Sequence, residues 1–518
     1  MTVNDQTLNK KLDNVLLEIK QACGVPELQL TDRSDKFLID SRQITPRMVQ
    51  MAINKLDCKK SYYDKIAPQV FKISGPNFVQ AISIVVDTWI RNFRSFDMDS
   101  GDQCYFNEIF MSQITPVVKN PNGDLTSSKN YRPISVSSVS MSIIERCISY
   151  IFGEEGLLDN QIGYRQRVGC STGINAVKTK INIRSKNSML FVGFLDASAA
   201  FDKVRRDKLF ESLLKLFPER ANVINLVANI YQSSTMKVKN CPETFKPNCG
   251  VRQGGILSGY LFNIFMRPLV KKLNGNVIQQ TIDYSNIMYA DDLVMFAPSV
   301  NGMSQMLNDC EDFAIENGLK WNPIKSKVMS FGVRSPKNFT LCNKSLEFVD
   351  SFKYLGFQLT KKKDLVCDND QLFGEARRIY KYTNIMMAAK MNKLSYDVKI
   401  SLIKTFGNIS FMECFNDYSN QAFRKVTGAH RYMVMRLLKF RNLQNEFNLP
   451  DGSWMGEKYD SCRANLFDVR SRWLFSPNNL SSMSEKIRHR QYKYANSLAN
   501  GNDLMVQIHG QMKFKLPP

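Results

Sequence analysis

Two adjacent acidic residues, Asp291 and Asp292, interrupt an otherwise apolar stretch over residues 286–297. Neighbouring buried carboxylates repel each other, because each negative charge disfavours ionisation of the other. Such a pair persists in an exposed turn, where Asp is common, or where cations neutralise it. The pattern predicts a short hairpin with both acids at its tip, which would aim two carboxylates at one point.

A third acid favours a cation-binding site over an exposed turn. Residues 189–195 form a continuous apolar run that ends abruptly on Asp196. Such a run predicts a strand buried on both faces, and an acid at its end is costly unless it is paired or bound to metal. With Asp291 and Asp292 it supplies enough oxygen ligands for two Mg²⁺ ions, which favours nucleotidyl transfer over an ordinary turn.

Periodicity predicts the elements around these acids. A strand is expected over 114–118 and helices over 141–152, 207–217 and 303–317. The helix over 207–217 is expected to bury an apolar face made of Leu209, Phe210, Leu213, Leu214 and Phe217. Gly318 suits the C-terminal cap of the helix over 303–317.

Five segments in order resemble those of reverse transcriptases. They are residues 130–135, 194–204, 251–263, 289–292 and 352–356. Tyr289-Ala290-Asp291-Asp292 resembles the catalytic signature, and the segment that begins at Phe194 resembles the first carboxylate motif. The whole is most similar to reverse transcriptases of non-LTR (LINE-type) retrotransposons, over roughly residues 48–360.

That resemblance implies an α+β fold, a right-hand polymerase with fingers, palm and helical thumb. The palm would be a ferredoxin-like split β-α-β sheet. The expected divisions are an N-terminal extension over 1–47, fingers over 48–188, a palm over 189–345, a primer grip and thumb over 346–460, and a basic tail over 461–518.

The resemblance also implies the roles of the acids. Asp196 and Asp291 are expected as direct ligands of two Mg²⁺ ions and Asp292 as a less direct one, with the backbone carbonyl of Ala197 as a further donor. Asp202 is expected to be structural and hydrogen-bonded. RNA-dependent RNA polymerases carry a second acid near this position, but there the catalytic tip is usually Gly-Asp-Asp.

Further residues are implied as substrate contacts. The expected contacts to the incoming nucleotide are Lys119, Arg132, Arg165, Phe201, Gln253, Gly254 and Lys325. Among these, Phe201 is expected to block a ribose 2′-hydroxyl, and Lys327 is an equal alternative to Lys325 near the departing pyrophosphate. The expected template and primer contacts are Arg252, Tyr289, Phe352, Tyr354, Leu355 and Gly356.

One position departs from the family pattern. Gly259 stands where family members commonly have proline after the Leu257-Ser258 pair. The departure predicts a looser loop at this point and leaves the chemistry unchanged.

Charge favours a polyanionic partner. The 518-residue chain has 70 basic and 48 acidic residues, a formal charge of +22. Between Gly374 and Arg441 there are thirteen basic residues and four acidic ones. This helical segment suits a thumb that grips a duplex by its phosphates, although a solvated helical face is an alternative. The expected partners are an RNA template, a DNA primer, their heteroduplex and dNTPs.

Cysteine usage and hydropathy favour an intracellular protein, in the nucleus or the cytoplasm. The 12 cysteines are dispersed without a Cys-x-x-Cys motif, and only three histidines accompany them, which disfavours a structural zinc site. No apolar run is long enough to span a bilayer and no signal peptide is evident, so neither membrane insertion nor secretion is expected.

These observations predict an RNA-directed DNA polymerase that extends a primer 3′-hydroxyl on RNA. The alternative is a non-catalytic RNA-binding host protein derived from such an element; an intron maturase or a telomerase fits less well. Only about 50 residues precede the polymerase region, too few for an ordinary nuclease domain. The chain is therefore expected to lack its endonuclease, as a fragment, a truncated copy or a host gene. Its oligomeric state stays open.

Overall fold

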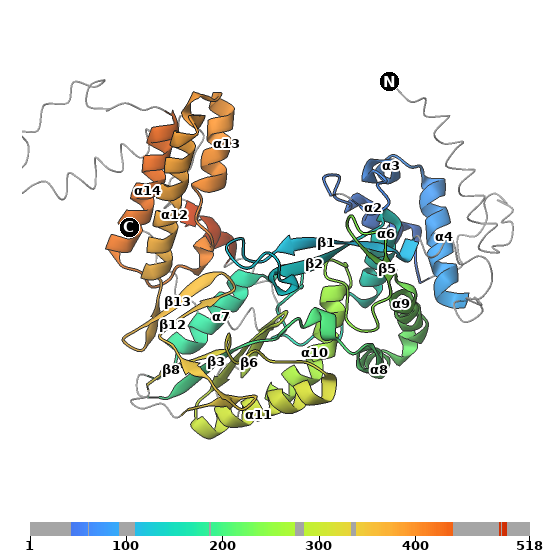
Figure 1. Cartoon of the computed structure of the whole chain (residues 1–518), viewed down its shortest axis with the longest axis horizontal. Helices are drawn as coiled ribbons and strands as arrows, with labels where there is room; N and C mark the ends of the chain where they lie inside the picture. Colours follow the sequence, from blue (N-terminus) through green and yellow to red (C-terminus); the bar gives the residue numbers. More distant parts are fainter. Residues whose placement is uncertain are drawn as a thin grey trace, which may run out of the picture. The chain divides into compact units, whose positions relative to one another are not determined.

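The structure is a computed structural model that describes residues 43–60, 62–92, 109–185, 188–274, 284–332, 338–438, 486–487 and 489–494 (Figure 1). The chain divides into two compact units. Unit 1 comprises residues 1–164, 196–272 and 308–322, and unit 2 comprises 165–195, 273–307 and 323–518. The N-terminal extension and most of the basic tail expected over 461–518 lie outside the described residues.

Unit 1 is mainly helical. Its described helices are α2 (Pro46–Asn54), α3 (Pro68–Lys72), α4 (Pro76–Asn92), α6 (Val139–Phe152), α8 (Arg206–Leu216), α9 (Ala221–Ser233) and α10 (Ser258–Asn274), with single turns at η2 (Ser128–Asn130), η3 (Phe201–Lys203) and η4 (Pro218–Arg220). The α6 helix begins where the Ser138 hydroxyl accepts the Met141 N–H at 3.0 Å, a standard N-terminal cap.

A four-stranded sheet completes unit 1, in the order β2-β1-β4-β5. Its strands are β1 (Ser112–Val118), β2 (Tyr131–Ser137), β4 (Met236–Val238) and β5 (Thr244–Phe245). The β1–β2 hairpin is antiparallel, from Ser112 opposite Ser137 to Val118 opposite Tyr131, and β4 joins β1 in parallel. The predicted strand over 114–118 is therefore confirmed as part of β1.

Unit 2 contains a five-stranded sheet in the order β11-β8-β3-β7-β6. Its strands are β3 (Leu190–Asp196), β6 (Asn286–Tyr289), β7 (Asp292–Ala297), β8 (Lys327–Phe331) and β11 (Glu347–Phe348). The central strand β3 is buried from Leu190 to Leu195, as its unbroken apolar run predicts, and it pairs antiparallel with β8.

Small hairpins and a helical bundle make up the rest of unit 2. The hairpin strands are β9 (Thr340–Leu341), β10 (Lys344–Ser345), β12 (Ser351–Tyr354), β13 (Phe357–Lys362) and β14 (Leu365–Cys367). The helices are α7 (Cys170–Asn182), α11 (Val300–Asn317, whose last turns belong to unit 1), α12 (Asn369–Ala388), α13 (Tyr396–Phe406) and α14 (Asn420–Leu438), with single turns at η5 (Met391–Lys393) and η6 (Met412–Cys414). Figure 1 shows α12, α13 and α14 side by side in orange.

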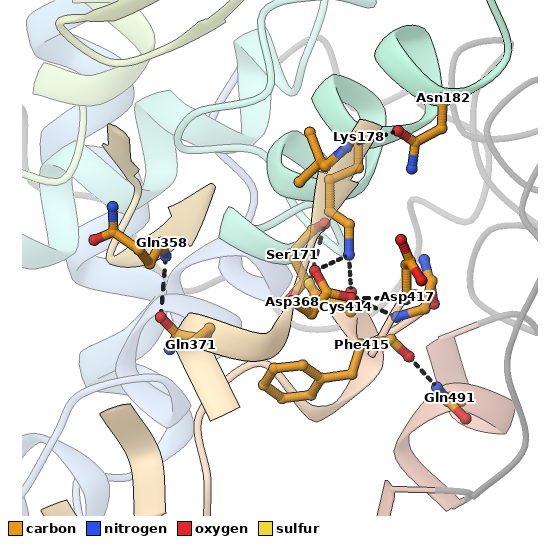
Figure 2. Close-up of polar contacts among 12 residues, drawn as sticks. Ser171, Lys178, Asn182, Gln358, Asp368, Gln371, Cys414, Phe415, Asp417 and Gln491 are labelled. Atoms are coloured by element: carbon orange, nitrogen blue, oxygen red, sulfur yellow. Dashed lines mark hydrogen bonds and ion pairs between the residues drawn. The ribbon is translucent and has the colours of Figure 1, made fainter. Parts of the chain in front are cut away.

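A buried ion pair ties α7 to the start of this bundle (Figure 2). The Lys178 ammonium donates to the Asp368 carboxylate at 2.6 Å and to the Cys414 carbonyl at 2.5 Å, and it lies 5.3 Å from the centre of the Phe357 ring. The other Asp368 oxygen accepts the N–H groups of Asn416 and Asp417 at 2.8 and 2.9 Å. Three segments distant in sequence are thus joined at one buried carboxylate.

Most predicted elements are confirmed, with one difference in a buried face. The helices over 141–152 and 303–317 are present as α6 and α11, and Gly318 has the positive φ of +69° expected of a cap. In α8, Leu209 and Leu213 are buried, but Leu214 is 38% exposed. Leu214 follows Leu213 directly and is rotated by about 100° on the helix, so only one of the two can face the core.

Candidate active site

The predicted catalytic acids lie at the ends of strands. Asp196 is the last residue of β3, Asp292 is the first of β7, and Asp291 lies in the turn that joins β6 to β7. Tyr289 pairs with Asp292, so Ala290 and Asp291 form the turn. Ala290 has a φ of +55°, a conformation that costs a non-glycine residue about 1–3 kcal/mol and that clusters at functional sites.

The structure does not test whether the three predicted carboxylates bind metal together. Within the ranges that the structure describes, no group of three or more His, Cys, Asp or Glu side chains could hold a metal ion. Three unscreened carboxylates would repel one another. The roles of Asp196, Asp291 and Asp292 as Mg²⁺ ligands therefore stay predictions.

Backbone hydrogen bonds fix the segment that follows Asp196. The Asp196 carbonyl accepts the Asn322 N–H at 2.9 Å, and the Ser198 N–H donates to the Lys320 carbonyl at 2.8 Å. These two bonds flank the antiparallel bridge between Ala197 and Trp321 and use neither backbone group of Ala197. The geometry is compatible with the predicted role of the Ala197 carbonyl as an additional ligand.

The predicted primer-grip residues form a hairpin that packs on β3. The β12–β13 hairpin turns through Leu355 and Gly356, which have φ values of +46° and +86°. The Phe352 ring stacks on the Phe194 ring, with centroids 4.3 Å apart, and the Tyr354 ring lies 5.8 Å from the same ring. The strand that ends in the first predicted acid thus also carries the platform for this hairpin.

The Tyr354 side chain does not reach solvent, because it is only 2% exposed. Burial raises the pKa of its hydroxyl well above the usual value, and the negative charge of Asp292 raises it further. The charge of Asp292 on the β6–β7 hairpin therefore acts on the Tyr354 hydroxyl. The predicted direct contact of Tyr354 with primer or template does not agree with its burial; Phe352, Leu355 and Gly356 are the more exposed members of the hairpin.

Several predicted nucleotide contacts come together in unit 1. The Gln253 amide donates to the Asp202 carboxylate at 2.9 Å, which confirms that Asp202 is hydrogen-bonded. Burial raises the pKa of Asp202, while the Gln253 bond and the positive charge of Lys119 lower it. Lys119 is itself exposed, and its ammonium donates to the Lys129 carbonyl at 2.9 Å. The β1–β2 hairpin and the Gln253 segment therefore share one electrostatic environment.

Close backbone contact brings the Gly254 segment against β2. The Gln253 carbonyl accepts the Ser135 N–H at 2.6 Å. Gly254 has a φ of +107°, and a Cβ at this position would lie 2.8 Å from the Ser135 carbonyl oxygen. Only glycine can adopt this positive φ and also lie this close to Ser135. This explains why residue 254, a predicted substrate contact, is a glycine.

The Arg252 prediction needs correction. Its side chain is buried, and its guanidinium pairs with the Glu145 carboxylate of α6. The second Glu145 oxygen accepts the Ile256 N–H at 2.8 Å. A guanidinium buried in this way does not face a template strand; Arg252 and the Ile256 N–H instead bind the same Glu145 carboxylate, which holds the turn over 252–256.

The remaining predicted cations differ in exposure. Arg132 is exposed on β2, Arg165 is half-buried in the segment before α7, and Lys325 is exposed ahead of β8. Lys327 lies on β8 and its ammonium is 2.7 Å from the Glu347 carboxylate. The choice between Lys325 and Lys327 as the lysine near the departing pyrophosphate stays open.

Sequence reasoning missed Glu145 and Asn263. Glu145 is a lone acid inside the apolar helix over 141–152, and a buried acid requires a partner, so a signal was present. Asn263 is fully buried; its side chain donates to the Gly163 carbonyl at 2.8 Å, and its own carbonyl accepts the Gln161 side-chain amide at 2.6 Å. No local pattern marks an asparagine for that task.

Comparison with known proteins identifies the central segment. Residues 118–359 match the family described as reverse transcriptase (RNA-dependent DNA polymerase). The matched segment covers less than half of the chain. It contains both acidic strand ends, the Gln253 segment and the β12–β13 hairpin up to Leu359. The resemblance inferred from the motifs is confirmed, and the α+β right-hand polymerase fold expected from it agrees with the mixed helices and sheets described above.

The chain is similar to proteins of non-LTR retrotransposons. It is 30% identical over 248 residues to the Retrovirus-related Pol polyprotein from type-1 retrotransposable element R2 of Nasonia vitripennis, with 44% of this chain and 24% of that protein covered. It is 26% identical over 263 residues to the corresponding type-2 element protein R2DM of Drosophila melanogaster, with 46% and 24% covered. The match thus spans about a quarter of each relative, and the expected lack of an endonuclease stays a prediction.

Solved structures of telomerase show a distant likeness. One from Candida albicans, in complex with a TWJ fragment of telomeric RNA, is 11% identical with a TM-score of 0.38, over 65% of this chain and 63% of that one. One from Candida tropicalis, in the same kind of complex, is 14% identical with a TM-score of 0.37, over 86% and 75%. Similarity at this level carries no argument about this chain.

None of the helices within the described ranges combines the length and the apolar character needed to cross a membrane.

Proposed function

We propose that this chain is an RNA-directed DNA polymerase that extends a primer 3′-hydroxyl with dNTPs on an RNA template. The observation that carries the proposal is the coincidence of the match to the reverse transcriptase family over 118–359 with Asp291 at the strained tip of the β6–β7 hairpin. The formal charge of +22 supports RNA and a growing heteroduplex as partners.

The strand arrangement supports a joint role for the three acids. β3 and β7 are neighbours in the sheet, and a Cβ on Gly193 would lie 3.4 Å from the Met295 methyl carbon. Asp196 ends one of these neighbouring strands, and Asp291 and Asp292 stand at the start of the other. We propose on this basis that the three acids act together.

The donor set fits a hard divalent cation. Carboxylate and carbonyl oxygens are the ligands that Mg²⁺ prefers, and Asp196, Asp291, Asp292 and the Ala197 carbonyl supply only oxygen. When bound, two such ions would assist deprotonation of the primer hydroxyl and neutralise charge on the leaving pyrophosphate.

The chain's own residues would position the reactants. The exposed cations Lys119, Arg132 and Lys325 would bind triphosphate oxygens, where positive charge also stabilises the transition state. Gly254, packed directly against β2, would form part of the surface beside the nascent base pair, and the Phe201 ring would exclude a ribose 2′-hydroxyl. The Leu355-Gly356 turn would hold the primer end, on a hairpin anchored by the Phe194–Phe352 stack.

The fold divisions inferred from the resemblance are part of this proposal. Fingers over 48–188, a palm over 189–345 and a primer grip with thumb over 346–460 assign the β1–β2 hairpin to the fingers. The five-stranded sheet falls almost wholly in the palm, and α12, α13 and α14 form the thumb.

The test is primer extension on an RNA template with Mg²⁺ and dNTPs, comparing the wild-type chain with Asp291→Ala and Asp312→Ala. Asp312 is an exposed aspartate on α11 and serves as the matched control. We expect extension by the wild type and by Asp312→Ala. Extension by Asp291→Ala should fall by about a hundred- to a thousandfold, the range for loss of one charge-stabilising group.

Two outcomes would contradict the proposal. Equal extension by Asp291→Ala would remove the β6–β7 turn from the chemistry. No extension by folded wild-type protein that binds primer–template would favour the non-catalytic RNA-binding alternative.

A further inference from the structure

The substitution of glycine for the usual proline at residue 259 creates a site for an aromatic ring. A Cβ built on Gly259 would lie 2.3 Å from Cγ of Tyr164 and 2.7 Å from its Cβ. These Tyr164 atoms are close to the backbone, so a rotation of the side chain cannot relieve the overlap. The Tyr164 ring therefore occupies the space that any larger residue at 259 would need.

The backbone of Tyr164 is strained to reach this position. Its φ is +60°, a left-handed conformation that is rare for a bulky aromatic residue. Hydrogen bonds from α10 hold the preceding loop: the Asn263 amide binds the Gly163 carbonyl, and the Asn263 carbonyl binds Gln161. Asn263 lies one helical turn after Gly259, so the same face of α10 both fixes the loop and receives the ring.

The same face of α10 also contacts Phe201, the predicted sugar gate. The Phe201 ring stacks on the Phe262 ring with centroids 4.6 Å apart and planes at 9°. The Tyr164 ring meets Phe201 edge-on, with centroids 5.9 Å apart and planes at 70°. Phe262 is fully buried, so it forms a rigid floor, while Tyr164 is 59% exposed and stands at the open side of the gate.

We propose that Tyr164 is a positioning residue for sugar discrimination: its ring edge, seated on Gly259, holds Phe201 in the position that excludes a ribose 2′-hydroxyl. Phe201 is held by Phe262 on one face and by Tyr164 at its flank, so the ring cannot tilt to admit a larger sugar. The inference rests on the proposed polymerase function and assigns a role to the Gly259 departure, which sequence analysis interpreted as a looser loop.

The alternative reading of Tyr164 is a surface aromatic with no effect on the substrate. A structural role alone would change dNTP and rNTP incorporation to the same extent. Discrimination between the two sugars is therefore the readout, measured as the ratio of kcat/KM for dNTP to that for the matching rNTP.

The experiment measures this ratio on an RNA template for the wild type, Tyr164→Ala, Tyr164→Phe, Gly259→Ala, Phe201→Ala, and Tyr164→Ala combined with Phe201→Ala. The ratio should fall about three- to tenfold in Tyr164→Ala, the range of one edge-on ring contact. Tyr164→Phe keeps the ring edge and should match the wild type. Gly259→Ala displaces the ring and should resemble Tyr164→Ala, and the double variant should discriminate no worse than Phe201→Ala.

An unchanged ratio in both Tyr164→Ala and Gly259→Ala, with Asp291-dependent extension intact in the wild type, would overturn the inference and leave the polymerase proposal standing. Additive losses in the double variant would also overturn it, because Tyr164 would then act independently of Phe201. Wild-type protein without Asp291-dependent extension would overturn both proposals.

Discussion

Among the described residues, a buried ion pair lies in each unit, and these two pairs are built differently. In unit 2, the Lys178 ammonium has the Asp368 carboxylate, the Cys414 carbonyl and the Phe357 ring around it. In unit 1, the Arg252 guanidinium binds Glu145 through one nitrogen and lies 5.3 Å from the centre of the Tyr231 ring. Its Nε and Nη1 atoms are buried without a hydrogen-bond partner among the described residues.

The difference in hydrogen bonding between the two ion pairs leads us to expect different roles for them. A buried charged group whose hydrogen-bonding atoms all have partners stabilises the segments that it joins. A buried charged group with unpaired atoms lowers the stability of the fold. The unit 2 pair joins α7, the start of α12 and the η6 segment. The unit 1 pair holds the turn that presents Gln253 and Gly254. We therefore expect the unit 2 pair to control folding and the unit 1 pair to control activity.

The largest effect is expected for Lys178→Met. It leaves the Asp368 carboxylate buried without its counter-ion, which costs about 3–5 kcal/mol in comparable cases. Denaturant unfolding of the purified chain measures the loss. Lys178→Met combined with Asp368→Asn should recover part of the stability, because the asparagine carbonyl oxygen can still accept the Asn416 and Asp417 N–H groups and no uncompensated charge is left buried. A double variant as unstable as the single one would show that packing, not charge, dominates here.

A smaller loss of stability and a larger loss of activity are expected for Glu145→Gln. Glutamine can still accept the Ile256 N–H, so the turn keeps one of its two contacts, and the unfolding free energy should fall by about 1–3 kcal/mol. The kcat/KM for dNTP should fall about tenfold or more, because small displacements of positioning groups are costly. Glu243→Gln, at an exposed glutamate, is the control. Full activity in Glu145→Gln would show that the Glu145–Arg252 pair does not control activity.

The smallest effect depends on pH and concerns a third buried basic group. His430 in α14 is fully buried, and its Nε2 lies 3.3 Å from the Lys486 ammonium. Burial, aided by the charge of Lys486, lowers the pKa of His430 to about 3. The folded pKa lies below the unfolded one, so stability is complete above about pH 6.5 and is lost as the pH falls toward the folded value.

Between pH 7 and pH 5, this histidine should account for about 2 kcal/mol of lost stability. His430→Gln removes the titration, so its unfolding free energy should fall less over the same range. Thermal or denaturant unfolding at the two pH values measures the difference. Parallel losses in the wild type and His430→Gln would show that His430 protonates as readily when folded as when unfolded.

The sequence predicts the fold better near the acids than away from them. The run that ends on Asp196 and the acids at Asp291 and Asp292 define three strands, because burial and charge leave few other arrangements. Long-range contacts were out of reach: Tyr354 and Arg252 were predicted to touch nucleic acid, and both are buried by partners distant in sequence. The Lys178–Asp368 pair spans 190 positions, and no local pattern connects its two residues.

The Gly259 departure shows the same limit in a different form. From sequence, a glycine in place of proline indicates only freedom of the backbone. The structure shows an occupied site, because the neighbouring ring comes from Tyr164, far earlier in the chain. The structural role of a glycine such as Gly259 can be inferred only when the group that fills the space beside it is known.

The order of strands in the five-stranded sheet has a consequence for biosynthesis. β3 lies between β7 and β8, which follow it by roughly a hundred residues or more along the chain, so a growing chain exposes this apolar strand until both partners have been made. A product that stops short of β8 would leave one edge of β3 unpaired and prone to association with other chains. The order of strands in the sheet would therefore direct incomplete products of this chain toward aggregation.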